Sequence, residues 1–219
     1  VRGHSDCVWS VDLAPDGENL VTGSRDGSVR LCRWKEWLHN DADRVVTKWT
    51  TATEHSVAYS RDGRQVAVAI ADNTVARLST DDFAETFRFG PVSDLATTVS
   101  VAFSPDGQSV LTGTKDGHIL VRDVTGGEFR KRRAHSREIF QLSFSPEGKM
   151  FTTCSGNGEL RLWSWPEMKQ IADLKLHDGW VLSACFSPDG KTLASCGSDG
   201  TAVLWDVATR VPRRVLPQH

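Results

Sequence analysis

Long hydrophobic runs are missing from this sequence of 219 residues. The longest apolar stretch, Val66 to Ala71, has six residues, whereas a membrane-spanning helix needs about twenty. The first residues do not resemble a signal peptide, and no initiating Met precedes Val1. We therefore expect a protein without membrane partners, and we interpret the missing Met as a sign of a processed or partial chain.

An excess of charge of one sign is also absent. The chain has 26 Lys and Arg, 28 Asp and Glu, and a formal net charge of −2. A net charge this small produces no global field that would recruit nucleic acid or an anionic membrane. The composition, 39% hydrophobic and 25% charged, is that of a folded globular chain and argues against disorder.

Paired cysteines are lacking. The five cysteines are odd in number, widely spread and without a C-x-x-C pair: Cys7, Cys32, Cys154, Cys185 and Cys196. This pattern excludes a small disulfide-bonded secreted scaffold. We expect reduced and mostly buried thiols, and hence a cytoplasmic protein.

Recognised catalytic and metal-binding motifs are absent as well. The chain has no H-E-x-x-H, C-x-x-C, EF-hand or G-x-S-x-G pattern. Gly190-Lys191-Thr192 ends like a phosphate-binding loop, but Cys185 stands where that loop requires its first Gly. The sequence therefore predicts no catalytic residue, no metal site and no cofactor.

Regularly spaced turns are what the chain has instead. Five acidic–Gly turns begin at Asp16, Asp62, Asp106, Glu147 and Asp189, and a second turn follows each one ten residues later, at Asp26, Asp72, Asp116, Asn157 and Asp199. The repeat period is 46, 44, 41 and 42 residues. Gly and Asn adopt positive φ at low cost, as tight turns between antiparallel strands require.

The segments around these turns predict four strands in each unit. Apolar residues alternate before the first turn, as in Val11 and Leu13, and one strand such as Glu18–Arg25 separates the two turns. The third strands are expected at Ser28–Arg33, Thr74–Ser79, His118–Asp123, Glu159–Ser164 and Thr201–Asp206, and the fourth at Val45–Thr50, Thr86–Phe89, Glu128–Arg132, Gln170–Leu174 and Pro212–Leu216. An antiparallel meander of about 40–45 residues is typical of a propeller blade.

The motifs of these units resemble the WD-repeat (tryptophan–aspartate repeat) family. The last unit has the sequence LHDGWVLSACFSPDGKTLASCGSDGTAVLWD, the first begins GHSDCVWSVDLAPDG, and the fourth contains AHSREIFQLSFSPEG and LRLW. The resemblance covers essentially the whole chain. It implies an all-β fold, a β-propeller of four-stranded antiparallel blades with five blades present.

The resemblance also implies a polar network that joins a His, a Ser or Thr, a turn Asp and a Trp. Only the fifth unit is complete, with His177, Ser195, Asp199 and Trp205. The fourth has His135, Thr153 and Trp163 with Asn157 in place of the acid, and the first has His4, Thr22 and Asp26 with Cys32 in place of the Trp. The third keeps Thr112 and Asp116 and has Arg122 at the Trp position, while the second keeps only Asp72, with Val68 and Leu78 at the other positions. We expect these groups to be structural, because hydrogen bonds among them tie a loop to its blade.

Candidate partner-binding residues follow from the repeat. The loop before the first strand and the second turn lie at the same end of a blade, the top face. Exposed side chains expected there are Trp9, Arg25, Lys115, Arg137, Glu138, Phe140 and Trp180, besides Asp6 and Ser198. Aromatic and Arg side chains are favoured interface anchors, and Trp9 and Phe140 occupy the same register. The alternative is that the aromatic residues pack between blades or line the channel wall.

A basic run, Arg130-Lys131-Arg132-Arg133, precedes the fourth unit, and Arg210, Arg213 and Arg214 occupy the equivalent stretch of the next one. The simplest interpretation is a solvated outer strand whose charges prevent edge pairing. A phosphate-contacting patch or a nuclear-import signal is the alternative. Because aromatic residues do not alternate with these charges, nucleic-acid binding is the less favoured interpretation.

We expect one propeller segment over residues 1–219, with units at about 3–47, 48–92, 93–133, 134–175 and 176–219. Both chain ends fall at the same phase of the repeat, so we expect an open arc or part of a larger ring. An open stack exposes apolar blade faces. A compact, non-associating monomer would therefore count against this expectation.

Two classes of function remain open from the sequence. The favoured one is a non-catalytic scaffold that presents its top-face loops and channel mouth to protein or peptide partners. The alternative is a propeller enzyme or small-ligand-binding propeller with a site in the central channel. The blades are also compatible with a sensor or scaffold segment of a larger, kinase-bearing bacterial protein.

Overall fold

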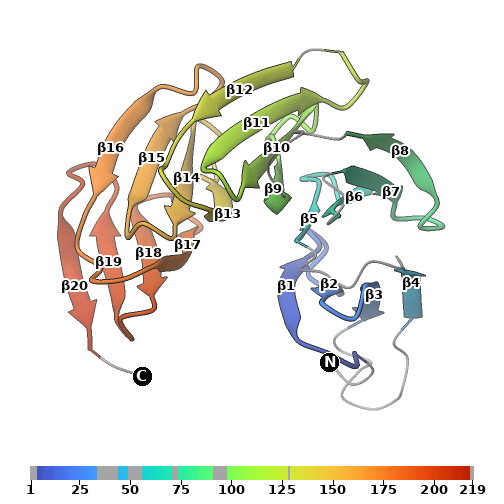
Figure 1. The fold of residues 1–219 in the computed structure, drawn as a ribbon, viewed down its shortest axis with the longest axis horizontal. Coiled ribbons are helices and arrows are strands. Elements are labelled where there is room, and N and C mark those ends of the chain that lie inside the picture. Colours follow the sequence, from blue (N-terminus) through green and yellow to red (C-terminus); the bar gives the residue numbers. More distant parts are fainter. Residues whose placement is uncertain are drawn as a thin grey trace. The chain divides into compact units, whose positions relative to one another are not determined.

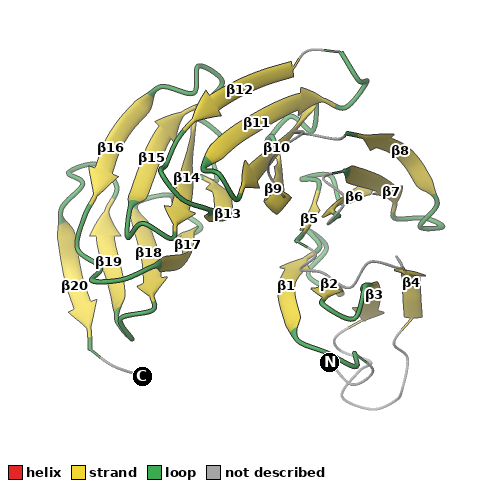
Figure 2. Ribbon diagram, viewed as in Figure 1, coloured by secondary structure: helices red, strands yellow, loops and turns green. Residues whose placement is uncertain are grey.

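The computed structural model describes residues 4–33, 44–48, 56–70, 74–90, 98–127 and 129–217, of which 44–48 are described by their backbone. These residues form twenty β-strands and no helix (Figure 2). Accordingly, the described ranges contain no helix that is long and apolar enough to cross a membrane. The predicted all-β fold is confirmed.

The strands form five antiparallel sheets of four strands each, which we call blades 1 to 5 (Figure 1). In every sheet the strands pair in chain order, as in a meander. Blade 1 contains β1 (Val8–Leu13), β2 (Asn19–Ser24), β3 (Ser28–Arg33) and β4 (Arg44–Lys48), and blade 2 contains β5 (Val57–Tyr59), β6 (Gln65–Ala69), β7 (Val75–Ser79) and β8 (Glu85–Phe89).

Blades 3 to 5 repeat the same order. Their strands are β9 (Thr98–Phe103), β10 (Ser109–Thr114), β11 (His118–Asp123) and β12 (Phe129–Arg133); β13 (Ile139–Phe144), β14 (Met150–Ser155), β15 (Leu160–Ser164) and β16 (Gln170–Leu174); and β17 (Val181–Phe186), β18 (Thr192–Gly197), β19 (Ala202–Asp206) and β20 (Pro212–Leu216). The predicted third and fourth strands agree with these bounds to within one residue, except that β4 ends at Lys48 and positions 49 and 50 lie outside the described residues.

Contacts divide the chain into two compact units. Unit 1 comprises Val1–Thr112 and Val121–Phe129, and unit 2 comprises Gly113–Leu120 and Arg130–His219. Blades 1 and 2 therefore belong to unit 1, blades 4 and 5 belong to unit 2, and the strands of blade 3 contribute to both.

Side-chain hydrogen bonds fix the first turn of most blades. In blade 3, the Ser104 hydroxyl donates to Asp106, whose carboxylate accepts the backbone N–H of Gln108 at 3.0 Å. The same Ser–Asp bond recurs in blades 2 and 5, from Ser60 and Ser187. This turn chemistry explains why the acidic–Gly pairs of the sequence mark the strand ends so accurately.

Each unit has a core between two neighbouring blades. In unit 1, Val21 and Val29 of blade 1 belong to one buried cluster with Val66, Val68 and Leu78 of blade 2. In unit 2, residues of blade 4 such as Leu160 pack with Val181, Val203 and Trp205 of blade 5. Burial of these apolar faces stabilises the stacking of the blades, because it removes apolar surface from water.

Polar side chains also join the first strands of neighbouring blades. In unit 1, Asp12 of β1 accepts the N–H of Tyr59 in β5 at 2.7 Å. In unit 2, Gln141 of β13 accepts the N–H of Ala184 in β17 at 2.7 Å. Burial raises the pKa of the Asp12 carboxyl, and the hydrogen bond from Tyr59 opposes that rise.

The five cysteines are free, as expected, but the prediction of mostly buried thiols is wrong. Cys32 and Cys154 are buried, whereas Cys7, Cys185 and Cys196 are exposed. Cys185 and Cys196 lie on β17 and β18, opposite Ala194 and Ser183, and their sheet face is the one turned away from Ala184 and Ser195. Exposure of that face explains the exposure of both thiols.

Candidate interaction surface

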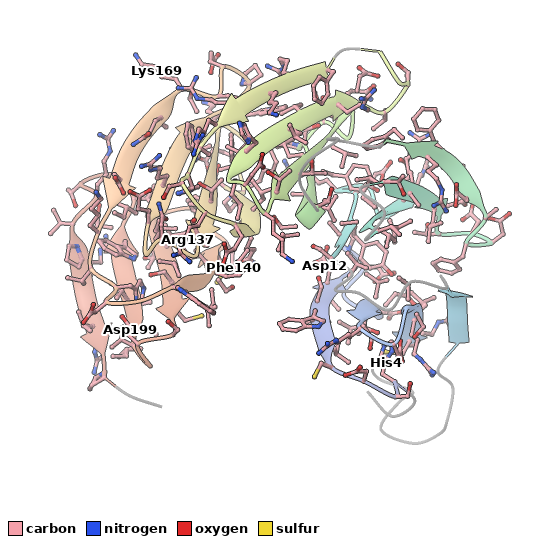
Figure 3. The ribbon with its side chains drawn as sticks, in the orientation of Figure 1. His4, Asp12, Arg137, Phe140, Lys169 and Asp199 are labelled. Atoms are coloured by element: carbon pink, nitrogen blue, oxygen red, sulfur yellow. The ribbon has the colours of Figure 1, made fainter. Side chains whose placement is uncertain are left out.

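Blade 5 has a hydrogen-bonded network that joins the loop before the blade to its second turn. His177 Nδ1 lies 3.0 Å from Asp199 Oδ2, and His177 Nε2 lies 2.8 Å from Ser195 Oγ. The indole N–H of Trp205 donates to Ser195 Oγ at 2.9 Å. Because the carboxylate can only accept, Nδ1 carries the proton and Nε2 accepts from the Ser195 hydroxyl. Figure 3 labels Asp199 at the turn of this blade.

Burial alone would raise the pKa of Asp199. Hydrogen bonds from Thr201, from the N–H of Asp178 and from His177 outweigh burial and lower that pKa to about 2. Every polar member of the network therefore has a partner, and the imidazole lies between two groups that fix its orientation. This arrangement stabilises the loop rather than exposing a nucleophile.

Blade 1 has the same network without the indole. His4 Nδ1 lies 3.0 Å from Asp26 Oδ2, and His4 Nε2 lies 2.9 Å from Thr22 Oγ1. Cys32, at the Trp position, is buried. Hydrogen bonds from Ser28 and from the N–H of Ser5 hold the pKa of Asp26 well below its usual range, against the effect of burial.

Blade 4 replaces the missing turn acid with a residue that the sequence analysis overlooked. His135 Nε2 lies 2.6 Å from Thr153 Oγ1, which also accepts the Trp163 indole N–H at 2.9 Å. The acid partner of His135 is Glu159, whose Oε2 lies 3.2 Å from Nδ1. Asn157, at the turn position, donates to Glu159 Oε2 at 2.8 Å. Burial, together with the charge of Arg161, lowers the pKa of His135 to about 4.

Blade 3 retains less of the network. Asp116 Oδ2 lies 3.0 Å from His118 Nδ1, and the Thr114 hydroxyl donates to Asp116. The Thr112 hydroxyl is buried without a hydrogen-bond partner among the described residues, and Arg122, at the Trp position, stacks on Phe89 and Phe129.

In blade 2, Val68 and Leu78 are buried and apolar. The predicted turn residue Asp72 lies outside the described residues.

A fixed position accounts for what the sequence analysis missed. The residue two places after the turn acid or Asn contacts the network in each of blades 1, 3, 4 and 5: Ser28, His118, Glu159 and Thr201. All four side chains are polar, but only the hydroxyls of Ser28 and Thr201 make the same contacts, each to the His Nδ1 and the turn Asp. The available signal was the spacing from the turn, because residue type varies at this position.

The first strands of blades 1, 4 and 5 each carry a β-bulge near the start. The pairing register shifts between Val8 and Ser10, between Ile139 and Gln141, and between Val181 and Ser183. The residues skipped by the pairing are Trp9, Phe140 and Leu182. A bulged residue is released from the ladder and its side chain is redirected, so each of these strands presents one large apolar side chain outside the regular alternation.

In unit 2 the bulged residue Phe140 pairs with Trp180, which directly precedes β17 of the next blade. The rings of Phe140 and Trp180 lie with their centroids 5.8 Å apart. Phe140 is half-buried, whereas Trp180 and Leu182 are 49% and 42% exposed. The pair therefore spans two blades and leaves much of the Trp180 indole open to solvent.

Close contacts join the loops that carry two of the charged candidates, Lys115 and Arg137. A Cβ on Gly117, in the second turn of blade 3, would lie 2.7 Å from the carbonyl oxygen of Arg137. Lys115 belongs to the same turn, and Arg137 precedes Phe140 by three residues. Both cationic side chains are exposed. Figure 3 labels Arg137 and Phe140 at the start of β13.

Glu138 occupies a different part of this surface. Its side chain is half-buried, and a Cβ on Gly156 would come within 2.6 Å of its Oε1. The carboxylate is therefore directed toward the second turn of its own blade. We call Lys115, Arg137, Phe140, Trp180 and Leu182 the unit 2 patch.

The two remaining candidates lie in unit 1. Trp9 is 54% exposed at the bulge of β1. Arg25 is exposed in the second turn of blade 1, where its N–H donates to the carbonyl of Cys7 at 2.9 Å. Unit 1 therefore presents an aromatic and a cationic side chain at the same end of one blade.

The basic run of β12 packs partly on blade 4. The guanidinium carbons of Arg130 and Arg132 lie 5.3 Å from the ring centroids of Trp165 and Trp163, respectively. Lys131 and Arg133 alternate with them and are exposed. Two of the four charges therefore join β12 to blade 4 through cation–π contacts.

Groups of His, Cys, Asp or Glu suited to holding a metal ion do not occur among the described residues.

Five meander blades, with loop-to-turn networks in blades 1, 4 and 5, define a repeat protein of the β-propeller class. The family model of the WD domain, G-beta repeat, matches residues 1–33, 90–123, 127–164 and 168–206. The chain therefore belongs to the WD-repeat family. The unmatched part contains blade 2, in which Val68 and Leu78 replace the polar network.

Individual relatives share a moderate identity with this chain. It is 30% identical over 180 residues to Protein ANTHESIS POMOTING FACTOR 1 of Arabidopsis thaliana, covering 78% of this chain and 52% of that protein. It is 27% identical over 172 residues to Transcription initiation factor TFIID subunit 5 of Caenorhabditis elegans, covering 78% and 25%. It is 24% identical over 177 residues to THO complex subunit 3 of Arabidopsis thaliana, covering 80% and 55%. The chain thus spans between a quarter and just over half the length of these relatives.

Proposed function

We propose that this chain is a non-catalytic protein-interaction module whose bulged strands and top-face loops contact protein partners. The observation that carries the proposal is the Phe140–Trp180 pair, which is held between two blades and is partly open to solvent. A large, rigid aromatic surface beside polar side chains is the usual anchor of a protein interface. Two relatives are named as subunits of complexes, which supports an assembly role.

The proposal includes a cytoplasmic location and the absence of catalysis. The free state of all five cysteines supports a reducing compartment. The polar networks support the second point, because Ser195, His177 and Asp199 are hydrogen-bonded to one another and to Trp205 in the interior of a blade.

Quantitative affinity capture with matched variants tests this function. The full-length protein is compared with its Trp180→Ser variant and with Val215→Ser, a control of similar exposure on the outer strand β20. We expect Trp180→Ser to reduce recovery of specific partners at least about tenfold, as for an interface hot spot, and Val215→Ser to leave it unchanged. Equal recovery with both variants would show that the top face does not carry the interaction.

A further inference from the structure

We propose that the unit 2 patch recognises an acidic peptide segment that carries a large apolar side chain. The inference rests on the proposed function and adds the chemistry of the partner. It depends on three features of unit 2: the open side of the aromatic pair, the position of the two cations, and the direction of the nearest carboxylates.

The aromatic pair supplies the apolar contact. Phe140 supports Trp180 from the neighbouring blade, so the indole is held in place although it is 49% exposed. The backbone of Trp180 is fixed as well, because its N–H donates to Ser198 Oγ at 2.9 Å and its carbonyl accepts the N–H of Ser198 at 2.8 Å. A preordered aromatic surface loses little conformational entropy on binding an apolar side chain.

Lys115 and Arg137 supply the charge. The structure places them on loops that touch through Gly117, whose carbonyl accepts the N–H groups of Ala134 and His135 at 2.9 Å. Within the described part of the chain, neither cationic side chain has a hydrogen bond or an ion pair. Two cations on touching loops, free to form ion pairs, favour a carboxylate-bearing partner, and Arg offers bidentate geometry to it.

The carboxylates of the surroundings bond to groups other than Lys115 and Arg137. Asp116 is paired with His118 and bonded to Thr114, and Asp199 is bonded to His177 and Thr201. Glu138 is directed toward Gly156. Asp178 is exposed beside Gly179 on the blade 5 side, so it weakens rather than supports the attraction of an acidic segment.

Selection from a random-peptide display library on the full-length protein tests the proposal without a known partner. We expect enriched peptides to combine Asp or Glu with a Leu, Phe or Trp. Their affinity is then measured by fluorescence anisotropy for wild type, Arg137→Glu, Lys115→Glu, Trp180→Ser and the control Lys169→Glu. Lys169 is exposed and lies at the other end of blade 4 (Figure 3).

The three patch variants should each weaken binding about tenfold or more, Lys169→Glu should leave it unchanged, and Asp178→Asn should leave it equal or tighter. Enriched peptides that are basic or uncharged would overturn the proposal. So would acidic peptides whose binding survives Arg137→Glu and Lys115→Glu. Binding that is lost with Trp180→Ser but unchanged by Arg137→Glu and Lys115→Glu would agree with the proposed function and reject the acidic partner. If no peptide is enriched, or if binding is unchanged by all three variants, both the acidic partner and the proposed function are rejected.

Discussion

Single hydrogen-bonded residues determine how the loops of this protein are held. His4, His135 and His177 each lie between a hydroxyl and a carboxylate, and in blades 4 and 5 the hydroxyl also accepts an indole N–H. A buried hydrogen bond contributes about 1 kcal/mol net, and leaving one partner unpaired costs more. A substitution at one of these positions is therefore expected to loosen the loop before the blade, because the side chains of the network are directed into the blade and not toward the surface.

At the residue scale, we predict that acid destabilises unit 2 through His135. Its pKa in the folded protein, about 4, is lower than the value of about 6.5 expected for an unfolded chain. The unfolded state therefore binds more protons between these values. This contribution to stability is complete above pH 6.5 and is lost as the pH falls, by at most about 1.4 kcal/mol per pH unit.

Urea unfolding followed at pH 7, 6 and 5 measures this effect. Asp199 and Glu159 have lowered pKa values and their contributions are lost at more acidic pH, so comparison of the wild type with a His135 variant isolates the contribution of His135. The variant His135→Gln should be less stable at pH 7 and should show a weaker dependence on pH. An unchanged pH dependence in His135→Gln would contradict the assignment.

The residue scale also shows where sequence reasoning reaches its limit. The His, Thr, Ser and Trp members of the networks were predictable because the resemblance to the WD-repeat family implies them and the motifs place them in this sequence. Glu159 was not, because the turn of blade 4 has Asn157 where an acid was expected and the substitute lies two residues further on. A carboxylate that contacts the same imidazole from a different sequence position cannot be predicted from the repeat pattern.

At the scale of elements, the turns can be predicted from the sequence more readily than the bulges. Acidic–Gly pairs show the turns, since few residues adopt positive φ, and the strands between them follow with bounds close to those predicted. The bulges at Trp9, Phe140 and Leu182 are less visible, because one extra residue in a short strand resembles ordinary alternation. The shared register of Trp9 and Phe140 was evident from the repeat, but its cause was not.

The second turn of blade 3 gives a direct test at this scale. Gly117 has a φ of 81°, and a Cβ there would lie 2.3 Å from the carbonyl oxygen of His135. Gly107 has a φ of 69° and nothing within 4 Å of its Cβ position. We expect Gly107→Ala to cost about 1–2 kcal/mol from backbone strain alone and Gly117→Ala to cost at least about 2 kcal/mol more, because the loop must move.

Urea unfolding of the two variants under identical conditions measures the difference in free energy. Since Gly117 contacts the loop that carries Arg137, its substitution should also raise hydrogen exchange in residues 134–138. Equal destabilisation by both substitutions, with no local change in exchange, would show that the loop contact is unimportant.

At the scale of the whole molecule, one blade face stands out by its exposure. Val11 and Leu13 of β1 are 61% and 48% exposed, whereas Ala184, at the corresponding position of β17, is buried against blade 4. Exposed apolar faces of this kind promote association. We predict that the chain of 219 residues self-associates in a concentration-dependent way and that Val11→Thr with Leu13→Thr reduces the association.

Sedimentation velocity over a range of concentrations measures this. Val211→Thr, a change at an exposed apolar residue outside β1, is the matched control and should have little effect. A wild-type chain that stays monomeric at every concentration would contradict the prediction, and it would also contradict the expected open arc.

The central claim is that protein partners bind the bulged top face, and site-specific photo-crosslinking tests it most directly. Benzoylphenylalanine is introduced into the full-length protein at Trp180 or, as a control of similar exposure, at Val215, and cells are irradiated before purification. We predict covalent adducts to partner polypeptides from position 180 and none from position 215. Adducts from position 215 alone, or equal adducts from both positions, would contradict the account.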